Sequence, residues 1–561
     1  MCDPESTTAV HVELDVPARM RDGVVLRADV YRPAGDGPWP TIVIRTPYGK
    51  GVMFENTWNG LSGVEAARRG FMVVIQDVRG RYASDGEWHP LHHEGEDGAD
   101  TIAWAAELRG SNGRVGMWGG SYCGHTQLRA ALEQPPALAA ITPLMTWFEP
   151  RAGLVSRGGA IELSTAGTWP LIQGFDWLFR IGLPPDQAMA RAGALIEDID
   201  KLPDEGYWGL PAGNLPVLER HGTPGFVQLS AADDVQATDR VRIAGRQERI
   251  EVPSLHTGGW FDVFTQGTID NYMAMKALGR DARLIIGPWT HMDMLDTVGE
   301  RPFGVMSMRE APAHPHGDWS DELLAFLGRH LADDGAPADD GPPVRLFVMG
   351  RNEWRDEEAW PLERAEKERW HLHAGGTLDT EMPAGGAAPS EIEYDPADPV
   401  PTRGGAHLMA LGGRGPVDQA SIEARDDVLV FTSSVLEEDL EVTGRVRARL
   451  YVESSAPSTD WVARLCDVTP DGRSFNVCDG IVRIKEAADT RAEVEVDLWS
   501  TSNVFLSGHR VRLQITNSCF PRWDRNLNTG EPLGTDMVTA HQRLYHDAER
   551  PSHVELPVVR T

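Results

Sequence analysis

The chain has 561 residues, of which 41% are hydrophobic, and this length indicates roughly three or four domains with large cores. Its net charge of −31 at pH 7 repels phosphate backbones, so we expect no nucleic-acid partner. Five cysteines without metal-type spacing, no signal peptide at the N-terminus and no apolar stretch long enough for a bilayer favour a cytoplasmic protein that does not contact a membrane.

The first 149 residues alternate between predicted strands and helices. Apolar residues alternate over 10–16 and over 24–30 around the turn dipeptide Asp22-Gly23, which predicts a β-hairpin. Short apolar runs at 41–44 and 71–75 are typical of strands buried on both faces. The further elements predict a mostly parallel sheet covered by helices: helices at 61–69, 102–108 and 122–133, and strands at 115–118 and 138–141.

The rest of the chain divides into three further segments. Between 150 and 245, tryptophans, scattered helical segments and many Gly/Pro breaks indicate an insertion of helices. From 246 to 365 the β/α alternation resumes. From 366 to 561, short alternating segments separated by turn residues predict an all-β sandwich or jelly roll. Between 246 and 365 we expect strands at 252–255 and 284–286, helices at 269–275 and 323–331, and a loop at 332–343.

A glycine-rich turn between a buried strand and a helix surrounds Ser121. This is the setting of a nucleophile elbow, in which small residues allow a sharp turn that presents a serine hydroxyl at the edge of the sheet. The usual form has glycine two residues after the serine, whereas this chain has Cys123 there and Gly124 one position later. Glycine-rich turns also occur without chemistry, so the motif alone leaves a purely structural serine open. Cys123 is expected to be a packing residue.

A serine nucleophile needs a base and an acid that orients the base, in the chain order Ser, Asp, His for this type of fold. Asp262 follows a predicted strand and the expected turn at 258–260. His291 follows another strand and the expected turn at 288–290. Both lie where strand ends deliver residues to a crevice. We therefore predict Asp262 as the orienting acid and His291 as the base.

Other titratable residues compete for these roles. His256 lies at the expected end of its strand, before the turn, and Asp270 and Asp293 are expected at helix or surface positions. His371 and His373 fall on one face of a strand, as metal ligands could, but a third ligand is not evident nearby. We expect no metal and no cofactor.

Several motifs together resemble one family of hydrolases, which joins X-Pro dipeptidyl peptidases to bacterial cocaine esterases and related acyl hydrolases. The resemblance runs along nearly the whole chain, and the motifs occur in the family's order. The displaced glycine matches the family's own elbow, G-x-S-Y-x-G, at 119–124. The other motifs lie at 21–26, 45–48, 76–81, 84–87, 111–116, 259–262, 287–291 and 517–526.

The resemblance implies an α/β-hydrolase core with an inserted helical cap, followed by an all-β jelly-roll domain. It implies the triad of Ser121, Asp262 and His291, and an oxyanion hole made by the Tyr48 hydroxyl and the amide of Tyr122. A phenol is a good neutral donor to a developing oxyanion. Asp77 and Arg79, in a neighbouring motif, are expected to be structural, as an ion pair or loop anchor.

The substrate is predicted less directly. Family members that bind a free α-amine carry a carboxylate cluster, and none is evident at 263–265, just after the triad acid. Phe264 and Trp169 would favour an apolar or aromatic acyl group. We therefore expect an esterase acting on small acyl groups, with an amide or peptide hydrolase as the alternative. A catalytically silent hydrolase with a binding jelly roll is the alternative of another class. A homodimer is left open.

Overall fold

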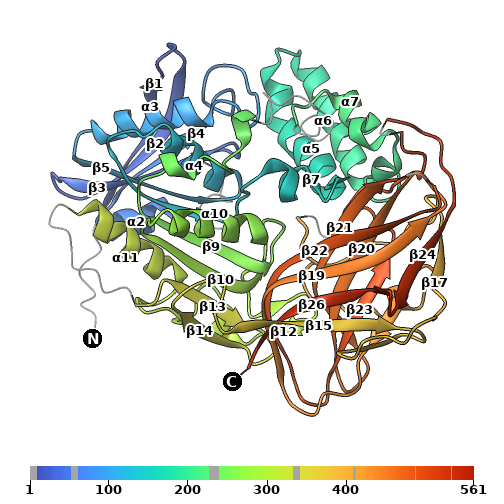
Figure 1. The fold of residues 1–561 in the computed structure, drawn as a ribbon. Coiled ribbons are helices and arrows are strands. Elements are labelled where there is room, and N and C mark those ends of the chain that lie inside the picture. Colours follow the sequence, from blue (N-terminus) through green and yellow to red (C-terminus); the bar gives the residue numbers. More distant parts are fainter. Residues whose placement is uncertain are drawn as a thin grey trace.

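The computed structural model describes residues 9–51, 61–225, 239–332, 341–408, 412–486, 488–531 and 533–560. Figure 1 shows an α/β core on the left, a helical cap at the upper right and a β-rich part at the lower right. This is the predicted α/β-hydrolase core with an inserted cap and a C-terminal jelly roll. The boundaries expected for these parts, at 149, 245 and 365, remain a prediction. Most of the loop expected at 332–343 lies outside the described residues.

The predicted N-terminal hairpin forms one edge of the core sheet. Its two strands pair in antiparallel fashion. The second strand joins the hairpin to the centre of the sheet, where neighbouring strands are mostly parallel. Within the described residues the sheet order is β1-β2-β4-β3-β5-β6-β9-β10-β13-β14. The bounds are β1 Val10–Arg19, β2 Val25–Pro33, β3 Trp39–Thr46, β4 Met72–Asp77, β5 Ser111–Gly120, β6 Leu138–Leu144, β9 Ser254–Phe261, β10 Ala282–Thr290, β13 Val344–Val348 and β14 Glu353–Glu357.

Helices cover both faces of this sheet (Figure 1), as the alternation predicts. The central strands are buried along their whole length, which explains their continuous apolar runs. The helices of the core are α2 Gly63–Arg68, α3 Glu94–Ala106, α4 Tyr122–Leu132, α10 Thr265–Ala277 and α11 Trp319–Leu331. Helix α11 begins with a reciprocal capping box between Asp318 and Asp321, a signal visible in the sequence.

The inserted segment is helical, as expected, and carries a small hairpin near its start. Arg81 joins it to the core, because its guanidinium donates to the carbonyl oxygens of Pro47 at 2.9 Å and of Gln173, in a cap helix, at 3.0 Å. The main cap elements in the described residues are β7 Ser156–Arg157, β8 Ala160–Ile161, α5 Leu163–Arg180, α6 Pro185–Asp200 and α7 Pro216–His221. No helix among the described residues is long and apolar enough to cross a membrane.

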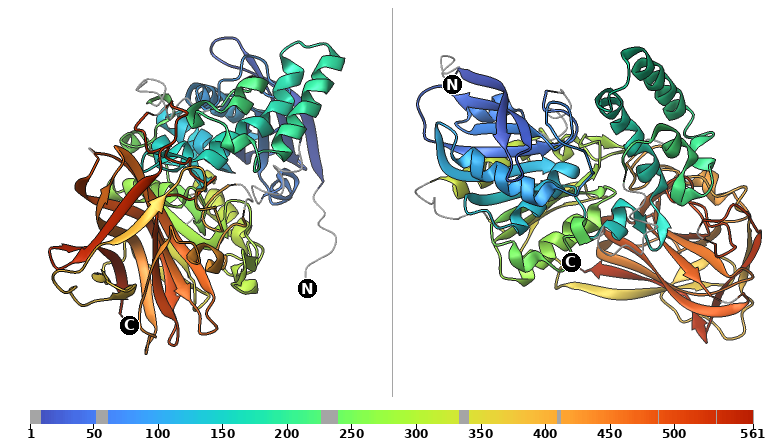
Figure 2. Two further views of the ribbon diagram at one scale, coloured as in Figure 1. Left: turned by 90° about the vertical axis from the view of Figure 1, so that its right-hand side faces the viewer. Right: turned by 90° about the horizontal axis from the view of Figure 1, so that it is seen from above.

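The C-terminal part is built almost entirely of strands and contacts both other parts (Figure 2). The Trp523 indole donates to the cap residue Glu162 at 2.8 Å, and the Met349 amide of the core donates to the Ser502 carbonyl at 3.0 Å. Its strands are β15 Ala365–His373, β16 Thr377–Asp379, β17 Ser390–Tyr394, β18 Leu429–Thr432, β19 Leu440–Ser454, β20 Ser458–Val468, β21 Ser474–Lys485, β22 Thr490–Phe505, β23 Arg510–Thr516, β24 Ala540–Asp547, β25 Arg550–Pro551 and β26 His553–Val559. It also contains the short helix α12 Ala420–Glu423, and the core segment contains the short strands β11 Thr297–Val298 and β12 Arg301–Pro302.

The turns expected at 258–260 and 288–290 are wrong, because both segments are strand. Strand β9 runs on to Phe261 and β10 to Thr290. The glycines that suggested turns are needed for close packing instead. A Cβ on Gly259 would lie 2.3 Å from the Trp289 carbonyl oxygen. The two site residues therefore follow their strands directly.

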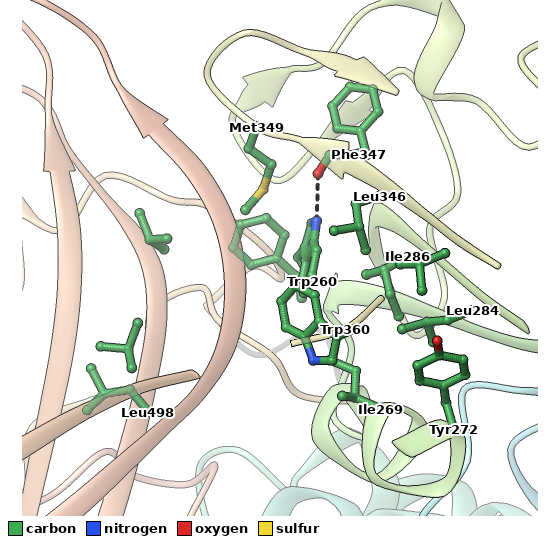
Figure 3. Close-up of a cluster of buried hydrophobic side chains, with 14 of the residues drawn as sticks. Trp260, Ile269, Tyr272, Leu284, Ile286, Leu346, Phe347, Met349, Trp360 and Leu498 are labelled. Atoms are coloured by element: carbon green, nitrogen blue, oxygen red, sulfur yellow. Dashed lines mark hydrogen bonds between the residues drawn. The ribbon is translucent and has the colours of Figure 1, made fainter. Parts of the chain in front are cut away.

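Trp260, at the end of β9, helps to join the core to the jelly roll. Its indole donates to the Phe347 carbonyl at 2.7 Å and its ring lies 5.9 Å from that of Trp360. Figure 3 shows these rings between the core residues Ile269 and Ile286 and the jelly-roll side chain Leu498. One apolar cluster thus extends from the sheet into the third part of the chain.

The buried His407 should make the protein less stable in acid. Burial lowers the pKa of His407 to about 4, and its Nε2 contacts the Gly413 carbonyl at 2.8 Å. The unfolded chain binds a proton at this residue below about pH 6.5, whereas the folded chain binds it only near pH 4. The stabilising effect of neutral His407 is therefore complete above pH 6.5 and is lost as the pH falls.

Urea unfolding at pH 7 and pH 5 measures this effect. The wild type should lose about 2 kcal/mol more between these pH values than His407→Gln, which cannot titrate at this position. Equal losses in the two proteins would contradict the assignment of a neutral buried histidine at position 407.

Candidate active site

Four strand ends bring the predicted site residues to one edge of the core sheet. Strands β3, β5, β9 and β10 are parallel in the sheet, so their carboxyl ends point the same way. Tyr48, Ser121, Asp262 and His291 follow these strands within two residues. Carboxyl ends of parallel strands are the usual location of ligand sites in α/β proteins.

Ser121 has the strained backbone of a nucleophile elbow. Its φ of 55° and ψ of −119° lie outside the regions that non-glycine residues normally adopt, at a cost of about 1–3 kcal/mol. Two hydrogen bonds hold this conformation. The Ser121 amide donates to the Leu144 carbonyl at 2.9 Å, and the Thr146 hydroxyl donates to the Ser121 carbonyl at 2.9 Å.

The spacing of the glycines around Ser121 has a steric explanation. A Cβ on Gly119 would lie 2.6 Å from the Cβ of Cys123. Position 119 therefore requires glycine, and the space this leaves allows Cys123 opposite it to be a buried packing residue. A Cβ on Gly124 would lie 2.9 Å from the Cβ of Thr146, where helix α4 approaches the chain after β6. The displaced glycine thus serves helix packing.

Asp262 and His291 form a buried pair. The His291 Nδ1 lies 2.6 Å from the Asp262 Oδ1, and the two side chains are 2% and 0% exposed. The rings of Phe264 and His291 meet edge to face, with their centroids 5.3 Å apart. A short contact of this kind fixes the orientation of an imidazole ring and favours the tautomer that carries the proton on Nδ1.

The Tyr48 side chain lies next to the cap. Its amide donates to the Thr46 hydroxyl at 3.0 Å, which forms a tight turn after β3. The Trp169 indole of cap helix α5 donates to the Tyr48 hydroxyl oxygen at 3.3 Å. The ring of Tyr122 stacks on Trp169 at 6.1 Å and meets Tyr48 edge-on at 6.5 Å. The structure therefore brings together Tyr48, Tyr122 and the predicted pocket residue Trp169.

An apolar cluster surrounds these residues and includes side chains that the sequence analysis did not single out. Trp88 packs on Trp169 at 5.7 Å, and Trp147 packs on Phe264 at 5.2 Å. Leu408, from the C-terminal part of the chain, contacts the same cluster. Isolated tryptophans and a loop leucine carry no local sequence signal for a site, so only the fold reveals them.

The competing residues have structural partners. His256 lies inside β9, where burial lowers its pKa to about 3. Asp270 accepts from the Gln266 side chain at 2.7 Å. Asp293 accepts from the Thr290 hydroxyl at 2.9 Å and from Arg414 at 3.1 Å. None of these contacts joins a rival to Ser121.

Asp77 and Arg79 anchor loops, as expected, but they do not pair with each other. Asp77 accepts from the Lys50 amide at 2.7 Å, and Arg79 binds Asp97 at 2.6 Å and Asp22 at 2.7 Å. These contacts hold the segment between β4 and α3 against its neighbours.

A cavity of about 560 Å³ lies elsewhere, between the cap hairpin and the jelly roll. Charged residues line it, among them Arg483, Asp524 and Arg525, and none of the predicted site residues does. The candidate site is therefore defined by its chemistry rather than by the size of this cavity.

The fold and the site together define a serine-type α/β-hydrolase with a cap and a jelly roll. A model of the X-Pro dipeptidyl-peptidase (S15 family) matches residues 22–293, and a model of the X-Pro dipeptidyl-peptidase C-terminal non-catalytic domain matches residues 336–555. Cocaine esterase from Rhodococcus sp. (strain MB1 Bresler) is 37% identical over 579 aligned positions, which cover 98% of this chain and 99% of that protein. The chain belongs to this family of X-Pro dipeptidyl peptidases and cocaine esterases.

Solved structures share the fold over the full length. An aminopeptidase from a marine sediment Thaumarchaeota archaeon superposes with a TM-score of 0.78 at 24% identity, covering 100% of this chain and 98% of that chain. An α-amino acid ester hydrolase gives a TM-score of 0.77 at 24% identity with the same coverage. The arrangement of core, cap and jelly roll is thus common to these proteins.

Proposed function

We propose that the protein hydrolyses carboxylic esters of small acyl groups through an acyl-enzyme on Ser121, with His291 as base and Asp262 as orienting acid. The observation that carries this proposal is the buried 2.6 Å contact between His291 and Asp262 at strand ends that also deliver the strained Ser121. Nucleophile, base and orienting acid are the groups that acyl transfer requires.

The proposed reaction has two steps. The Ser121 Oγ attacks the acyl carbonyl carbon while the His291 Nε2 takes the hydroxyl proton. The tetrahedral intermediate then collapses, and His291 gives that proton to the leaving alcohol. Water deacylates Ser121 by the same route, which releases the carboxylic acid and restores the serine. Asp262 stabilises the imidazolium that forms in each step.

The proposed oxyanion hole consists of the Tyr48 hydroxyl and the backbone N–H of Tyr122. We expect Tyr48→Phe to lower kcat by roughly 10²–10³, because one of two donors to the developing oxyanion is lost. KM should change little, since the substrate carbonyl carries less charge than the transition state. Steady-state kinetics on a nitrophenyl ester test this effect.

The control for this substitution is Trp169→Phe, which removes the indole donor to Tyr48 and keeps the apolar wall. It should cost much less than Tyr48→Phe. A larger loss in Trp169→Phe than in Tyr48→Phe would contradict the role given to the tyrosine hydroxyl.

Esters are favoured over amides by the surroundings of the site. The segment after the triad acid, 263–265, carries no carboxylate to bind a free α-amine. The described cluster around Trp169 and Phe264 is apolar, and the relative from Rhodococcus carries the name cocaine esterase. The family model, named for X-Pro dipeptidyl peptidases, supports the amide or peptide alternative.

Initial rates on a chromogenic panel separate the two candidates. The panel contains short and aromatic acyl nitrophenyl esters, an X-Pro anilide and a glutaryl anilide, with Ser121→Ala as the blank. Fast ester turnover with negligible anilide cleavage is the expected result. Preferential anilide cleavage would show an amidase or peptidase using the same residues.

Four other expectations stay predictions: a cytoplasmic location, the absence of a nucleic-acid partner, the domain boundaries and the homodimer that was left open. The small-molecule substrate follows from the proposed function.

A further inference from the structure

We propose that the Tyr122 side chain is a positioning device for the oxyanion hole, held by Glu94 and, through Glu94, by Arg45. The device would fix the position of the Tyr122 backbone N–H, which the proposed function assigns to the oxyanion. The inference therefore rests on the proposed function and adds two residues, Glu94 and Arg45, that neither touch the substrate nor belong to the triad.

The Tyr122 hydroxyl is held by two hydrogen bonds in the interior. It donates to the Glu94 Oε1 at 2.6 Å and accepts from the Leu91 amide at 2.8 Å. Leu91 has a φ of 71°, an unfavourable value for leucine, and this conformation presents its amide to the hydroxyl. The Tyr122 side chain is only 2% exposed, so water does not replace either contact.

Arg45 holds the other end of Glu94. The Arg45 Nη1 lies 2.7 Å from the Glu94 Oε2, and both residues are buried. The Arg45 Nε donates to the Gln76 side chain at 3.1 Å, which fixes the guanidinium in turn. Glu94 is the first residue of helix α3, where the helix dipole favours a carboxylate. Both Glu94 carboxylate oxygens are thus engaged, one by Arg45 and the other by the hydrogen bond from the Tyr122 hydroxyl.

This anchor can set the position of the amide because Tyr122 is the first residue of helix α4, directly after the strained Ser121. The Ser121 carbonyl shares a peptide plane with the Tyr122 N–H, and its hydrogen bonds from Thr146 and from the His125 amide limit rotation of that plane. A shift of the first turn of helix α4 would instead displace the Tyr122 Cα, and with it the N–H and the side chain. The hydroxyl contacts oppose that shift at the far end of the ring, and Trp169 opposes it along the ring face. The amide is therefore fixed before substrate binds, which is how preorganised donors act.

The hydroxyl is also kept as a donor. Burial, together with the neighbouring Glu94, raises the pKa of Tyr122 well above its ordinary value, so the phenol keeps its proton at neutral pH. Arg45 lies within β3 and Tyr48 lies just after it, so both belong to one short segment. One segment would then supply the hydroxyl donor directly and support the amide donor through Glu94.

The test is Tyr122→Phe, which removes only the hydroxyl and keeps the ring and the amide. On a nitrophenyl ester, kcat should fall roughly 10- to 100-fold, because the amide becomes free to move out of line, while KM changes little. The affinity for a simple arylboronic acid, which forms a tetrahedral adduct with a serine, should fall by a similar factor.

The matched control is Tyr394→Phe in the jelly roll. Tyr394 is also buried, and its hydroxyl donates to the Asn526 carbonyl at 3.0 Å, so this variant loses one internal hydrogen bond far from the site. It should keep wild-type kcat and boronate affinity even if its thermal stability falls. An equal loss of kcat in both variants would assign the effect to general destabilisation and overturn the proposal.

Glu94→Gln provides a second route. The glutamine keeps the shape and an acceptor for Tyr122 but loses the charge, so kcat should fall less than in Tyr122→Phe. In the double variant the Glu94→Gln change should add almost nothing, because the contact it acts through is already gone. Independent, multiplying effects would contradict an action of Glu94 through Tyr122.

The outcomes separate this inference from the proposed function. If Ser121→Ala keeps turnover, the proposed function fails and the anchor fails with it. If Ser121→Ala is inactive while folded Tyr122→Phe retains wild-type kcat and boronate affinity, the proposed function stands and the anchor alone is refuted.

Discussion

Replacing Ser121 with alanine should lower kcat on a nitrophenyl ester by roughly 10⁶-fold, to the level that substrate binding and the oxyanion hole alone supply. Ser121 takes the strained elbow position directly after β5. KM should remain close to that of the wild type, because alanine removes the nucleophile without filling the site. Initial rates at high enzyme concentration measure the residual activity, provided that contaminating esterases have been removed from the protein.

The control for this variant is Ser62→Ala. Ser62 also lies at the N-cap of a helix, α2, but has an ordinary φ of −72° and accepts from the Glu65 amide. Loss of that cap costs about 0.5–2 kcal/mol of stability and should leave kcat unchanged. A Ser121→Ala protein with wild-type turnover would refute the covalent mechanism.

Asp262→Asn should lower kcat by roughly 10⁴-fold. The amide nitrogen of asparagine can donate to the His291 Nδ1, which places the imidazole proton on the wrong nitrogen for a base. The present geometry, with Nδ1 2.6 Å from the Asp262 Oδ1, leaves little room for another arrangement. The loss should shrink at high pH, where hydroxide can replace the histidine as base, so the pH profile of kcat is the measurement.

Asp293→Asn is the matched control. Asp293 lies two residues after His291 but accepts from Thr290 and Arg414 rather than from the histidine. Its kcat should stay within a few-fold of the wild type. If Asp293→Asn were the variant that lost activity while Asp262→Asn kept it, the orienting acid would have to be reassigned.

The sequence predicts the order of strands and helices well where apolar runs are continuous. The strands around 71–75 and 115–118 are buried on both faces, and this leaves an unmistakable run of apolar residues. The sequence-based prediction fails where glycine can serve either a turn or close packing within a strand. Gly258 and Gly259 read as a turn, yet they lie within β9, where the backbone of Trp289 approaches Gly259 too closely for a side chain.

The candidate site is predicted in part. The residues that follow strands, Ser121, Asp262 and His291, can be selected from position alone, and the family motifs single out Tyr48. The contact between Trp169 and Tyr48 spans 121 positions along the chain, and Glu94 is one of many acidic residues in a highly charged chain. Contacts between side chains distant in sequence leave no local pattern, so they require the fold.

The most direct test of the mechanism is the covalent labelling of the protein with a fluorophosphonate, followed by peptide mass spectrometry. The proposed mechanism predicts a single adduct on Ser121 in the wild type, much slower labelling in Asp262→Asn and no adduct in Ser121→Ala. A folded wild type that is not labelled would favour a catalytically silent hydrolase. An adduct on a residue other than Ser121 would contradict the assignment of the nucleophile.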